Sequence, residues 1–583
     1  MGLYARKDGA NGHRILCSAL ADGFSATGPI VEEPAGFRPR LITMQRLVHI
    51  LRLWFDPARG ARQSVLARWV FLRALALIYL SAFYALLFQI KGLIGPQGIL
   101  PAGNYLRAVA QYFGSTRLWH APTLFWISSS SAAMMTVIWI GIAASLIAFF
   151  NVWPRVSFFV CFVCFLSFVT AAQDFSGYQS DGMLLEAGFI ALFFAPGGIW
   201  PGLAAADPPS RASLWLLRWE WFRIYFESGL VKLLSGDPEW RHLTAMDEYY
   251  QNGPLPTWIG WYVQHLPHWF QATTVVLTLG MELVLVWMLF FPRRVRLICF
   301  FIVTPWEVVV ILTGNYAFLN YIVLALGFLL LDDVYLRRLF PARFRPALAA
   351  PRSAEAAEPN QPAGKQEETG PRAGRIPRAI RVAVVMVSAL LLSWVGYSTT
   401  AELVDIAGPH PLPLEPAAWL EPFRIANQYG LFAVMTRGRY EIEFQGSDDG
   451  QNWKPYLFTH KPQLLNEAPG IYAPYQPRFD WNLWFASLGD WQQNSMVPIA
   501  EEDLLKNDRD VIGLFRSDPF DGKAPKQVRA VLWQYWFTSM AEKRQTGNWW
   551  KRRFLGLYAP ALERTPDGRF AITAPPDLLP EHD

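Results

Sequence analysis

The chain has 583 residues, of which 52% are hydrophobic, 15% are aromatic and only 17% are charged. It is too apolar for an ordinary soluble protein and too long for a single domain. The net charge of +5 is modest and comes without a lysine-rich stripe, which argues against a nucleic-acid partner.

Residues 1–64 precede the first long apolar stretch and are predicted to be a cytoplasmic segment, partly disordered. Residues 1–43 are polar and glycine-rich, and they lack the basic, apolar and small-residue order of a signal peptide. We therefore expect the first apolar stretch to remain in the mature protein. Met44 begins a more regular pattern, which makes it an alternative start codon to Met1.

Nine apolar stretches follow, and most are long enough to cross the roughly 30 Å hydrocarbon core of a bilayer. They predict an α-helical multi-pass membrane bundle over residues 65–335, with an outer loop at 235–269, and a last transmembrane helix at 379–399. Residues 336–378 are predicted to be a disordered cytoplasmic linker. The nine stretches are 68–90, 133–151, 154–173, 183–196, 212–234, 270–291, 295–313, 316–331 and 379–399.

Arginine gathers beside alternate stretches, and this sets the orientation because cytoplasmic loops carry an excess of Arg and Lys. Five arginines lie between residues 46 and 68, and the turn at 292–296 contains three more. The turns at 174–182 and 314–315 contain neither Arg nor Lys. The pattern predicts a cytoplasmic N-terminus and places the region after the ninth stretch, residues 400–583, on the outer side.

The fifth stretch carries charged side chains at membrane depth, where each costs on the order of 2.5 to 3.5 kcal/mol. Glu220, Arg223 and Glu227 have the spacing of one helical face. Internal pairing and a functional cavity are equally open interpretations, and Lys232, near the end of the stretch, can also snorkel to the surface. The candidate functional polar cluster comprises Glu186, Arg218, Glu220, Arg223, Glu227, Lys232, Asp237, Trp240, Arg241 and Asp247.

The outer loop after this stretch contains aromatic residues at helical spacing. They predict a helix that lies in the membrane interface, with Asp237, Arg241 and Asp247 at the outer mouth of the bundle. The apolar stripe of this helix comprises Trp258, Trp261, Tyr262, Leu266 and Trp269.

Residues 400–583 are predicted to form a β-rich, sandwich-like soluble domain. Residues 439–445 alternate in polarity, 447–450 form a turn, and 453–458 continue as a second strand, which indicates a hairpin. Further strands are predicted near 428–436, 511–516 and 527–537. The domain is rich in tryptophan, which fits a packed core, a headgroup contact or a platform for a client protein. The candidate client-binding residues are Trp453, Trp481 and Trp484.

No catalytic residue, metal site or cofactor is predicted. Cys161 and Cys164 have redox spacing, but they lie in mid-stretch with no neighbouring base to lower a thiol pKa. The histidines lack the tight spacing of a metal site. The chain contains no nucleophile elbow, phosphate loop or HExxH motif. Whether the protein is an enzyme is left open, with a non-enzymatic role favoured.

Three separated signatures resemble the lipase maturation factor family, over roughly residues 65 to 550. They are YQSDGMLLEAGF at 178–189, the run RIYFESGLVKL with SGDPEWRHLTAMDEYY and QNGPLP at 223–256, and NQYGLFAVMTRGRYEIEFQGSDDGQNWKPY with APYQPRFDWNLWFASL at 427–488. The resemblance implies a multi-pass membrane protein whose animal members lie in the endoplasmic reticulum and help secreted dimeric lipases reach an active fold. The membrane part is also distantly similar to that of the vitamin K-dependent gamma-carboxylase. The Arg-, Ala- and Pro-rich ends are typical of a bacterial member in the inner membrane.

Two function classes follow from these observations. The first is a chaperone-like maturation factor, held in the lipid bilayer, whose outer domain assists a secreted client protein, with lipases as candidates. The second is an integral membrane enzyme or transporter that uses the buried charged residues of the fifth stretch. The sequence does not name the client, a lipid ligand or the oligomeric state.

Overall fold

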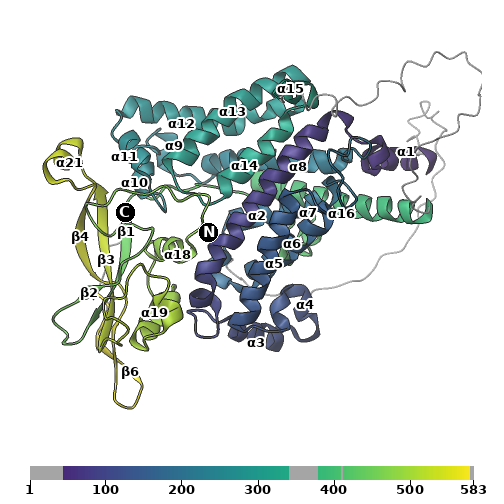
Figure 1. The fold of residues 1–583 in the computed structure, drawn as a ribbon. Coiled ribbons are helices and arrows are strands. Elements are labelled where there is room, and N and C mark those ends of the chain that lie inside the picture. Colours follow the sequence, from purple (N-terminus) through teal and green to yellow (C-terminus); the bar gives the residue numbers. More distant parts are fainter. Residues whose placement is uncertain (1–43, 340–377, 409–410, 578–583) are drawn as a thin grey trace, which may run out of the picture.

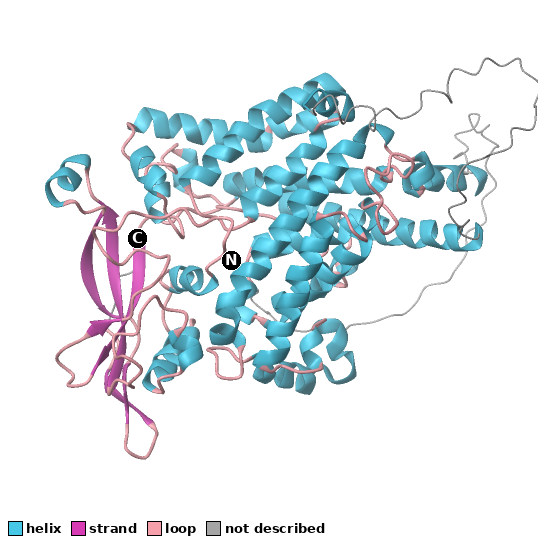
Figure 2. Ribbon diagram, viewed as in Figure 1, coloured by secondary structure: helices cyan, strands magenta, loops and turns pink. Residues whose placement is uncertain are grey.

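The computed structural model describes residues 44–339, 378–408 and 411–577. A helical bundle forms one side of the molecule, and an antiparallel sheet with its own short helices forms the other (Figures 1 and 2). The predicted segment 1–43 and most of the predicted linker 336–378 lie outside the described residues.

Each of the nine predicted stretches is helical. Among the described residues, six helices are long and apolar enough to cross a membrane, and a seventh qualifies if α14 and α15, which meet at a bend of 108°, count as one span. The other two stretches fall short because α7 has only 16 residues and α8 carries charged side chains along its length. The nine helices are α2 (Val65–Ile94), α5 (Ser131–Phe149), α6 (Pro154–Ala171), α7 (Gln179–Phe194), α8 (Arg211–Leu234), α12 (His268–Leu283), α13 (Arg293–Thr313), α14 (Leu319–Gly327) and α16 (Arg378–Ala407).

Shorter helices connect these elements and surround the sheet. The α-helices are α1 (Met44–Phe55), α3 (Ala102–Phe113), α4 (Arg117–His120), α9 (Pro238–Arg241), α10 (Tyr249–Asn252), α11 (Trp258–Gln264), α15 (Asp333–Leu339), α17 (Glu415–Ala418), α18 (Arg478–Ala486), α19 (Met496–Leu505), α20 (Arg509–Ile512) and α21 (Met540–Thr546). The 3-10 helices are η1 (Pro57–Arg59), η2 (Arg62–Ser64), η3 (Gly114–Thr116), η4 (Leu124–Trp126), η5 (Gln173–Ser176), η6 (Leu285–Phe290), η7 (Phe328–Leu330) and η10 (Glu421–Phe423).

One end of the bundle is closed by polar contacts between its own loops. The backbone N–H groups of Val65 and Leu66, at the start of α2, donate to the carboxylate of Asp333 at 3.0 and 2.9 Å. An acid at this position compensates the positive end of a helix dipole. Asn151, in the turn between α5 and α6, donates to the carbonyl of Gly202 at 2.6 Å. The loops after α5, α7 and α14 therefore lie at the same end as the start of α2.

The C-terminal domain contains one six-stranded antiparallel sheet, in the order β2-β1-β3-β5-β6, with β4 also paired to β3. The predicted hairpin is present as β1 and β2, and the predicted strand 527–537 is β3. The predicted strands at 428–436 and 511–516 are wrong, because the first is irregular and the second begins at the end of α20. The strands are β1 (Arg439–Ser447), β2 (Lys454–Pro455), β3 (Gln527–Phe537), β4 (Trp550–Leu557), β5 (Ala561–Arg564) and β6 (Phe570–Ala574).

Helices rather than a second sheet cover the inner face of this sheet, so the predicted sandwich-like form is wrong. α18 packs against β1, and α19 packs against β3. The alternating apolar residues of the strands, such as Ile442 and Leu532, are fully buried in one core with Leu483 and Leu504 of these helices. Full burial of each such side chain stabilises the fold by about 1.5 to 3 kcal/mol. An amphipathic helix can supply that cover as well as a sheet can.

The bundle and the sheet domain share one continuous apolar core. Gly92, near the end of α2, allows α20 to approach closely. A Cβ atom at this position would lie 2.3 Å from the carbonyl oxygen of Asp510 and 2.8 Å from the side chain of Leu514. The backbones of the two parts are therefore in direct contact, and the sheet domain is fixed on the bundle rather than tethered to it.

Candidate functional site

Arg223 lies at the centre of the charged residues predicted on the fifth stretch. It projects from α8, is fully buried, and forms an ion pair with Glu186 of α7. Its Nη1 lies 3.8 Å from Glu227 Oε1, one turn further along α8. Glu220, one turn earlier, is also fully buried. We call Glu186, Glu220, Arg223 and Glu227 the charged cluster.

A segment of the C-terminal region, Asn427–Leu431, contacts three residues of the charged cluster. We call it the anchor segment. The carbonyl of Asn427 accepts a hydrogen bond from Arg223 Nη1 at 2.6 Å. The backbone N–H of Tyr429 donates to Glu227 Oε2 at 2.6 Å, and its hydroxyl donates to Glu186 Oε2 at 2.8 Å. Both charged partners of Arg223 therefore also hold the anchor segment.

Neighbouring polar side chains of α7 and α8 continue this recognition of the backbone. Gly430 donates to Gln179 Oε1 at 3.1 Å, and Leu431 donates to Ser228 Oγ at 3.4 Å. Gly182 permits the close approach, because a Cβ atom there would lie 2.7 Å from Asn427 Oδ1. The bundle thus satisfies several main-chain groups of a segment that forms no regular structure of its own.

The cluster is therefore filled by the chain itself. Arg223 makes direct contacts with Glu186, Glu227 and the anchor segment, which is the arrangement that makes a buried ion pair tolerable. Of the two interpretations left open for these charges, internal pairing describes Arg223, Glu186 and Glu227. The partners of the pairing include residues from the C-terminal region as well as helices of the bundle.

A second group of predicted residues lies near the C-terminal end of α8. Lys232 Nζ is 2.9 Å from both carboxylate oxygens of Glu282 and lies over the ring of Trp240. Lys232 is 2% exposed, so the expectation that it snorkels is wrong. Trp240 Nε1 donates to the carbonyl of Phe432 at 3.0 Å, and Asp237 accepts from the backbone N–H of Met435 at 2.6 Å. These contacts fix the residues that follow the anchor segment.

Three predicted residues lie apart from both groups. Arg218 is half-buried and donates from Nε to the carbonyl of Leu329 at 2.8 Å. Arg241 is exposed. Asp247 lies 2.9 Å from Nδ1 of His268. The predicted polar cluster is therefore not one site, although helical spacing correctly grouped its central members.

The predicted client-binding tryptophans do not form a common surface. Trp481 and Trp484 are 6% and 7% exposed within α18, and the ring of Trp481 lies 4.9 Å from that of Tyr178. Trp453 is half-buried, with the guanidinium of Arg529 4.0 Å from its ring centre. Trp481 therefore serves the packing between the two parts of the molecule, and Trp484 is buried beside Phe485 of its own helix.

The predicted interfacial helix is broken into α11 and the start of α12, with Pro267 at the break. Trp258, Tyr262 and Trp269 are 44%, 45% and 69% exposed. Trp261 is instead fully buried, next to Phe537 and Trp549 of the sheet domain. One side of α11 and of the start of α12 is therefore exposed on the protein surface, while Trp261 on the other side of α11 packs against the sheet domain.

Sequence reasoning did not pair Asp181 with Arg478, which form a buried ion pair between the two parts. The guanidinium of Arg478 donates to both oxygens of Asp181 at 2.8 Å and to the carbonyl of Phe175 at 2.6 Å. Arg478 is 2% exposed. Although burial alone would lower the pKa of Arg478, the charge of Asp181 raises it above its ordinary value. Both residues lie within the family-like signatures, but nothing in one sequence links them.

Arg439, at the start of β1, is a further residue that sequence reasoning missed. It is fully buried and donates from Nη1 to the carbonyl of Gln251 at 3.0 Å and from Nη2 to that of Pro254 at 3.2 Å. It also pairs with Glu441. Burial lowers the pKa of Arg439, an effect that Glu441 partly offsets. Arg439 therefore binds the segment between α8 and α12 to the sheet.

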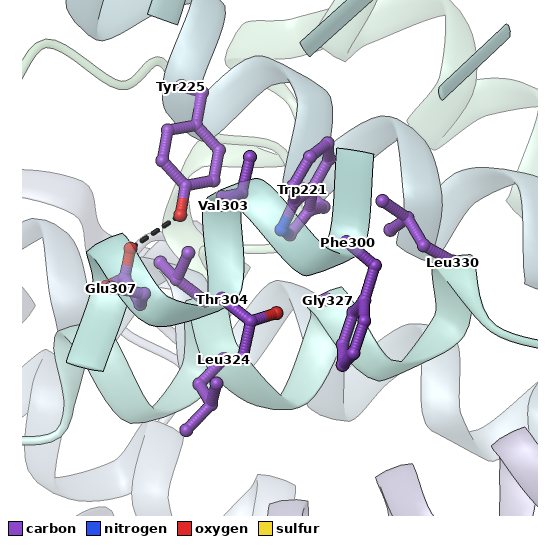
Figure 3. Close-up of a pocket in the computed structure, with 10 residues that line it drawn as sticks. Trp221, Tyr225, Phe300, Val303, Thr304, Glu307, Leu324, Gly327 and Leu330 are labelled. Atoms are coloured by element: carbon purple, nitrogen blue, oxygen red, sulfur yellow. Dashed lines mark hydrogen bonds between the residues drawn. The ribbon is translucent and has the colours of Figure 1, made fainter. Parts of the chain in front are cut away.

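A small pocket lies between α8, α13 and α14 (Figure 3). Apolar side chains such as Phe300, Val303 and Leu330 line it. Glu307, at one end, accepts hydrogen bonds from the hydroxyl of Tyr225 and from Asn320 Nδ2. Both carboxylate oxygens of Glu307 are thus bound within the protein. Across the described ranges, no group of three or more His, Cys, Asp and Glu residues is placed to hold a metal ion.

Replacing Tyr429 with phenylalanine is expected to destabilise the protein by about 1.5 to 3 kcal/mol, because a hydrogen bond to a buried carboxylate is lost. The backbone bond to Glu227 would remain. The thermal unfolding midpoint of the detergent-purified protein measures the effect. Tyr112→Phe is the matched control because Tyr112 is 84% exposed. Equal midpoints for the two variants would contradict the assigned contact.

Comparisons with known proteins cover both parts of the chain. Residues 66–338 match the family described as "Lipase maturation factor transmembrane domain", and residues 425–560 match "Lipase maturation factor C-terminal domain". Lipase maturation factor 2 of Gallus gallus is 31% identical over 90% of this chain and 85% of its own length. Lipase maturation factor 1 of Bos taurus is 31% identical over 86% of this chain and 89% of its own length.

Lipase maturation factor 1 of Homo sapiens is similar at 29% identity, over 85% of this chain and 88% of its own length. No solved structure matches the chain. The distant similarity to the gamma-carboxylase stays a prediction. The described charged cluster and the anchor segment fall within the two matched regions.

Proposed function

Because the chain belongs to the lipase maturation factor family, we propose that it is a membrane-anchored maturation factor for secreted proteins, with lipases as the first candidate clients. The helical bundle anchors the protein and fixes the position of the sheet domain. The sheet domain then assists the client as it folds on the non-cytoplasmic side. In this proposal the protein needs no cofactor and no catalytic residue.

The observation that carries this proposal is the occupation of the charged cluster by the anchor segment. An enzyme or transporter that used Glu220, Arg223 and Glu227 would need access to them. Arg223 and Glu227 instead bind the main chain of the outer domain, with every side chain of the cluster at most 1% exposed. The cost of burying these charges is offset by a rigid connection between bundle and sheet, which suits a scaffold better than a reaction site.

For the membrane topology we propose nine crossings, with the N-terminus in the cytoplasm of a bacterium and the sheet domain outside the inner membrane. The arginine distribution supports this orientation. The contacts of the described helices agree with it: Asp333 meets the start of α2 at one end of the bundle. Asp181 meets Arg478 of the sheet domain at the other end. The exposed aromatic residues of α11 and α12 would lie at the outer surface of the inner membrane, in its interface with water.

The topology predicts the activity of reporter fusions. Alkaline phosphatase fused after Asp583 is expected to be active, because that enzyme folds only outside the cytoplasm. The same reporter placed after Arg294, in the first turn of α13, is expected to be inactive. A cytoplasmic reporter such as green fluorescent protein should give the reverse pattern. An inactive phosphatase at Asp583 would mean that the number of crossings is even.

The proposed function is tested by comparing the secreted and periplasmic proteomes with and without this gene, together with lipase activity. We expect a selective loss of at least one active hydrolase while its transcript level is unchanged. A chain with Glu227→Gln should restore that hydrolase, because the amide oxygen of Gln can still accept the N–H of Tyr429. An unchanged proteome with altered lipids would favour the enzyme or transporter instead.

A further inference from the structure

We propose that the outer edge of β4 binds an extended, acidic segment of the client protein by adding it to the sheet as a further strand. This inference rests on the proposed function, since it names the surface by which the sheet domain would hold a client. It follows from the position of β4 in the sheet and from the charges along it.

β4 has one open edge within the part of the chain that the structure describes. Its residues pair with Val531–Phe537 of β3, and no described strand pairs with its other side. β5 continues along the same edge of β3, and β6 covers β5. Asp577 closes the end of β4, because its backbone N–H donates to the carbonyl of Leu557 at 3.0 Å. Lys551–Leu555 is the part that stays open.

This edge lies on the side of the sheet that faces away from the bundle (Figure 1). The bundle and the anchor segment therefore do not block it. Unpaired N–H and C=O groups along such an edge form a template for another strand. Main-chain hydrogen bonds then supply affinity, and the neighbouring side chains supply specificity.

Three consecutive basic residues, Lys551, Arg552 and Arg553, follow the open edge. Lys551 pairs with Glu542 at 3.1 Å, so Arg553 is the basic residue on this face that has no acidic partner among the described residues. Lys551 and Arg553 are exposed. Arg553 donates to Gln534 Oε1 at 2.8 Å and lies over the ring of Trp536, neither of which carries a charge. A carboxylate on an added strand would therefore meet a guanidinium that has only neutral partners here.

The other face combines charge with exposed aromatic surface. Arg552 pairs with Glu443 at 3.0 Å and lies 3.9 Å from the ring centre of Trp533. Phe554, which is 49% exposed, lies 5.1 Å from the same ring. Apolar side chains on this face of an added strand would pack against Phe554 and Trp533. The fitting partner is thus an extended segment in which acidic and apolar residues alternate.

The same charges argue against a second copy of the chain as the partner. Antiparallel pairing of two β4 strands would bring basic side chains near basic side chains, and like charges across strands are destabilising. Basic residues and a bulge, such as the one opposite Leu532 and Trp533, are also features that keep sheet edges from pairing with each other. An acidic segment removes this repulsion, so the edge selects a partner of opposite charge.

The test uses the full chain in nanodiscs of zwitterionic lipid and a fluorescent eight-residue peptide in which Glu and Val alternate. We expect the peptide to bind, and we expect Lys551→Glu with Arg553→Glu to weaken binding about tenfold or more, as for close charge pairs at interfaces. The matched control reverses Arg544 and Arg569, which are exposed but lie outside β4, and should change affinity less than twofold. Hydrogen exchange should slow in residues 550–557 when the peptide is bound.

Equal binding of a Lys/Val peptide, absence of binding, or binding without protection of β4 would overturn the inference. Preferential binding of anionic lipid vesicles that depends on Lys551 and Arg553 would also overturn it, because the basic residues would then serve a membrane surface. The amount of active client that is secreted distinguishes failure of this inference from failure of the proposed function. If the doubly reversed chain matures the client fully, the role of β4 is wrong and the proposed function stands. If loss of the whole gene affects no secreted protein, the proposed function fails.

Discussion

Replacing Arg223 with methionine is expected to abolish accumulation of the folded protein, the largest effect of any single substitution that we predict. The change removes the cation that Glu186 and Glu227 share and leaves the carbonyl of Asn427 without its donor. Breaking a buried pair from one side typically costs 3 to 5 kcal/mol, because the remaining charge is uncompensated. That is a large part of the roughly 5 to 15 kcal/mol by which proteins are stable.

The amount of protein in isolated membranes and the thermal unfolding midpoint after purification measure this effect. Arg241→Met is the matched control, since Arg241 is exposed at the end of α9. Arg223→Lys should be intermediate, because an ammonium group keeps the charge but lacks the planar fork that reaches several acceptors. A methionine variant that accumulates and unfolds like the wild type would contradict the structural role of the cluster.

Replacing Arg478 with methionine is expected to be the second most damaging change. It leaves the carboxylate of Asp181 buried without the two hydrogen bonds that now satisfy it, and it also removes the donor to Phe175. We expect a loss of about 3 to 5 kcal/mol by the same physical argument. Because the pair joins α7 to α18, the sheet domain should also become more accessible to protease than it is in the wild type.

A double variant distinguishes charge imbalance from loss of packing. Combining Asp181→Leu with Arg478→Met removes both charges, and apolar pairs of similar volume often replace buried ion pairs without loss. We expect the double variant to recover most of the unfolding midpoint lost in Arg478→Met. Arg516→Met is the control, because Arg516 forms a pair with Glu467 that is exposed on both sides. A double variant no more stable than the single one would mean that the pair acts mainly through its geometry.

The positions of the helices could be predicted from the sequence because they depend on local patterns. Each of the nine apolar stretches is helical. A helix satisfies its backbone hydrogen bonds within itself, as an apolar segment in a bilayer requires. Hydropathy alone does not give the number of membrane crossings, because α7 is short and α8 is charged. The hairpin of β1 and β2 was also predictable, since alternating polarity around a turn is a local signal.

The spacing of Glu220, Arg223 and Glu227 alone places them on one helical face, because residues three and four apart are neighbours on any helix. The groups that these side chains bind depend on how distant parts of the chain fold together. The anchor segment lies far along the chain, since Arg223 and Asn427 are 204 positions apart. Arg478 and Asp181 are separated by 297 residues. The covering of the sheet by helices and the burial of Trp481 likewise depend on which apolar surfaces meet. Local periodicity fixes which face of an element is polar or apolar, whereas the partner of that face is selected by packing among all elements at once.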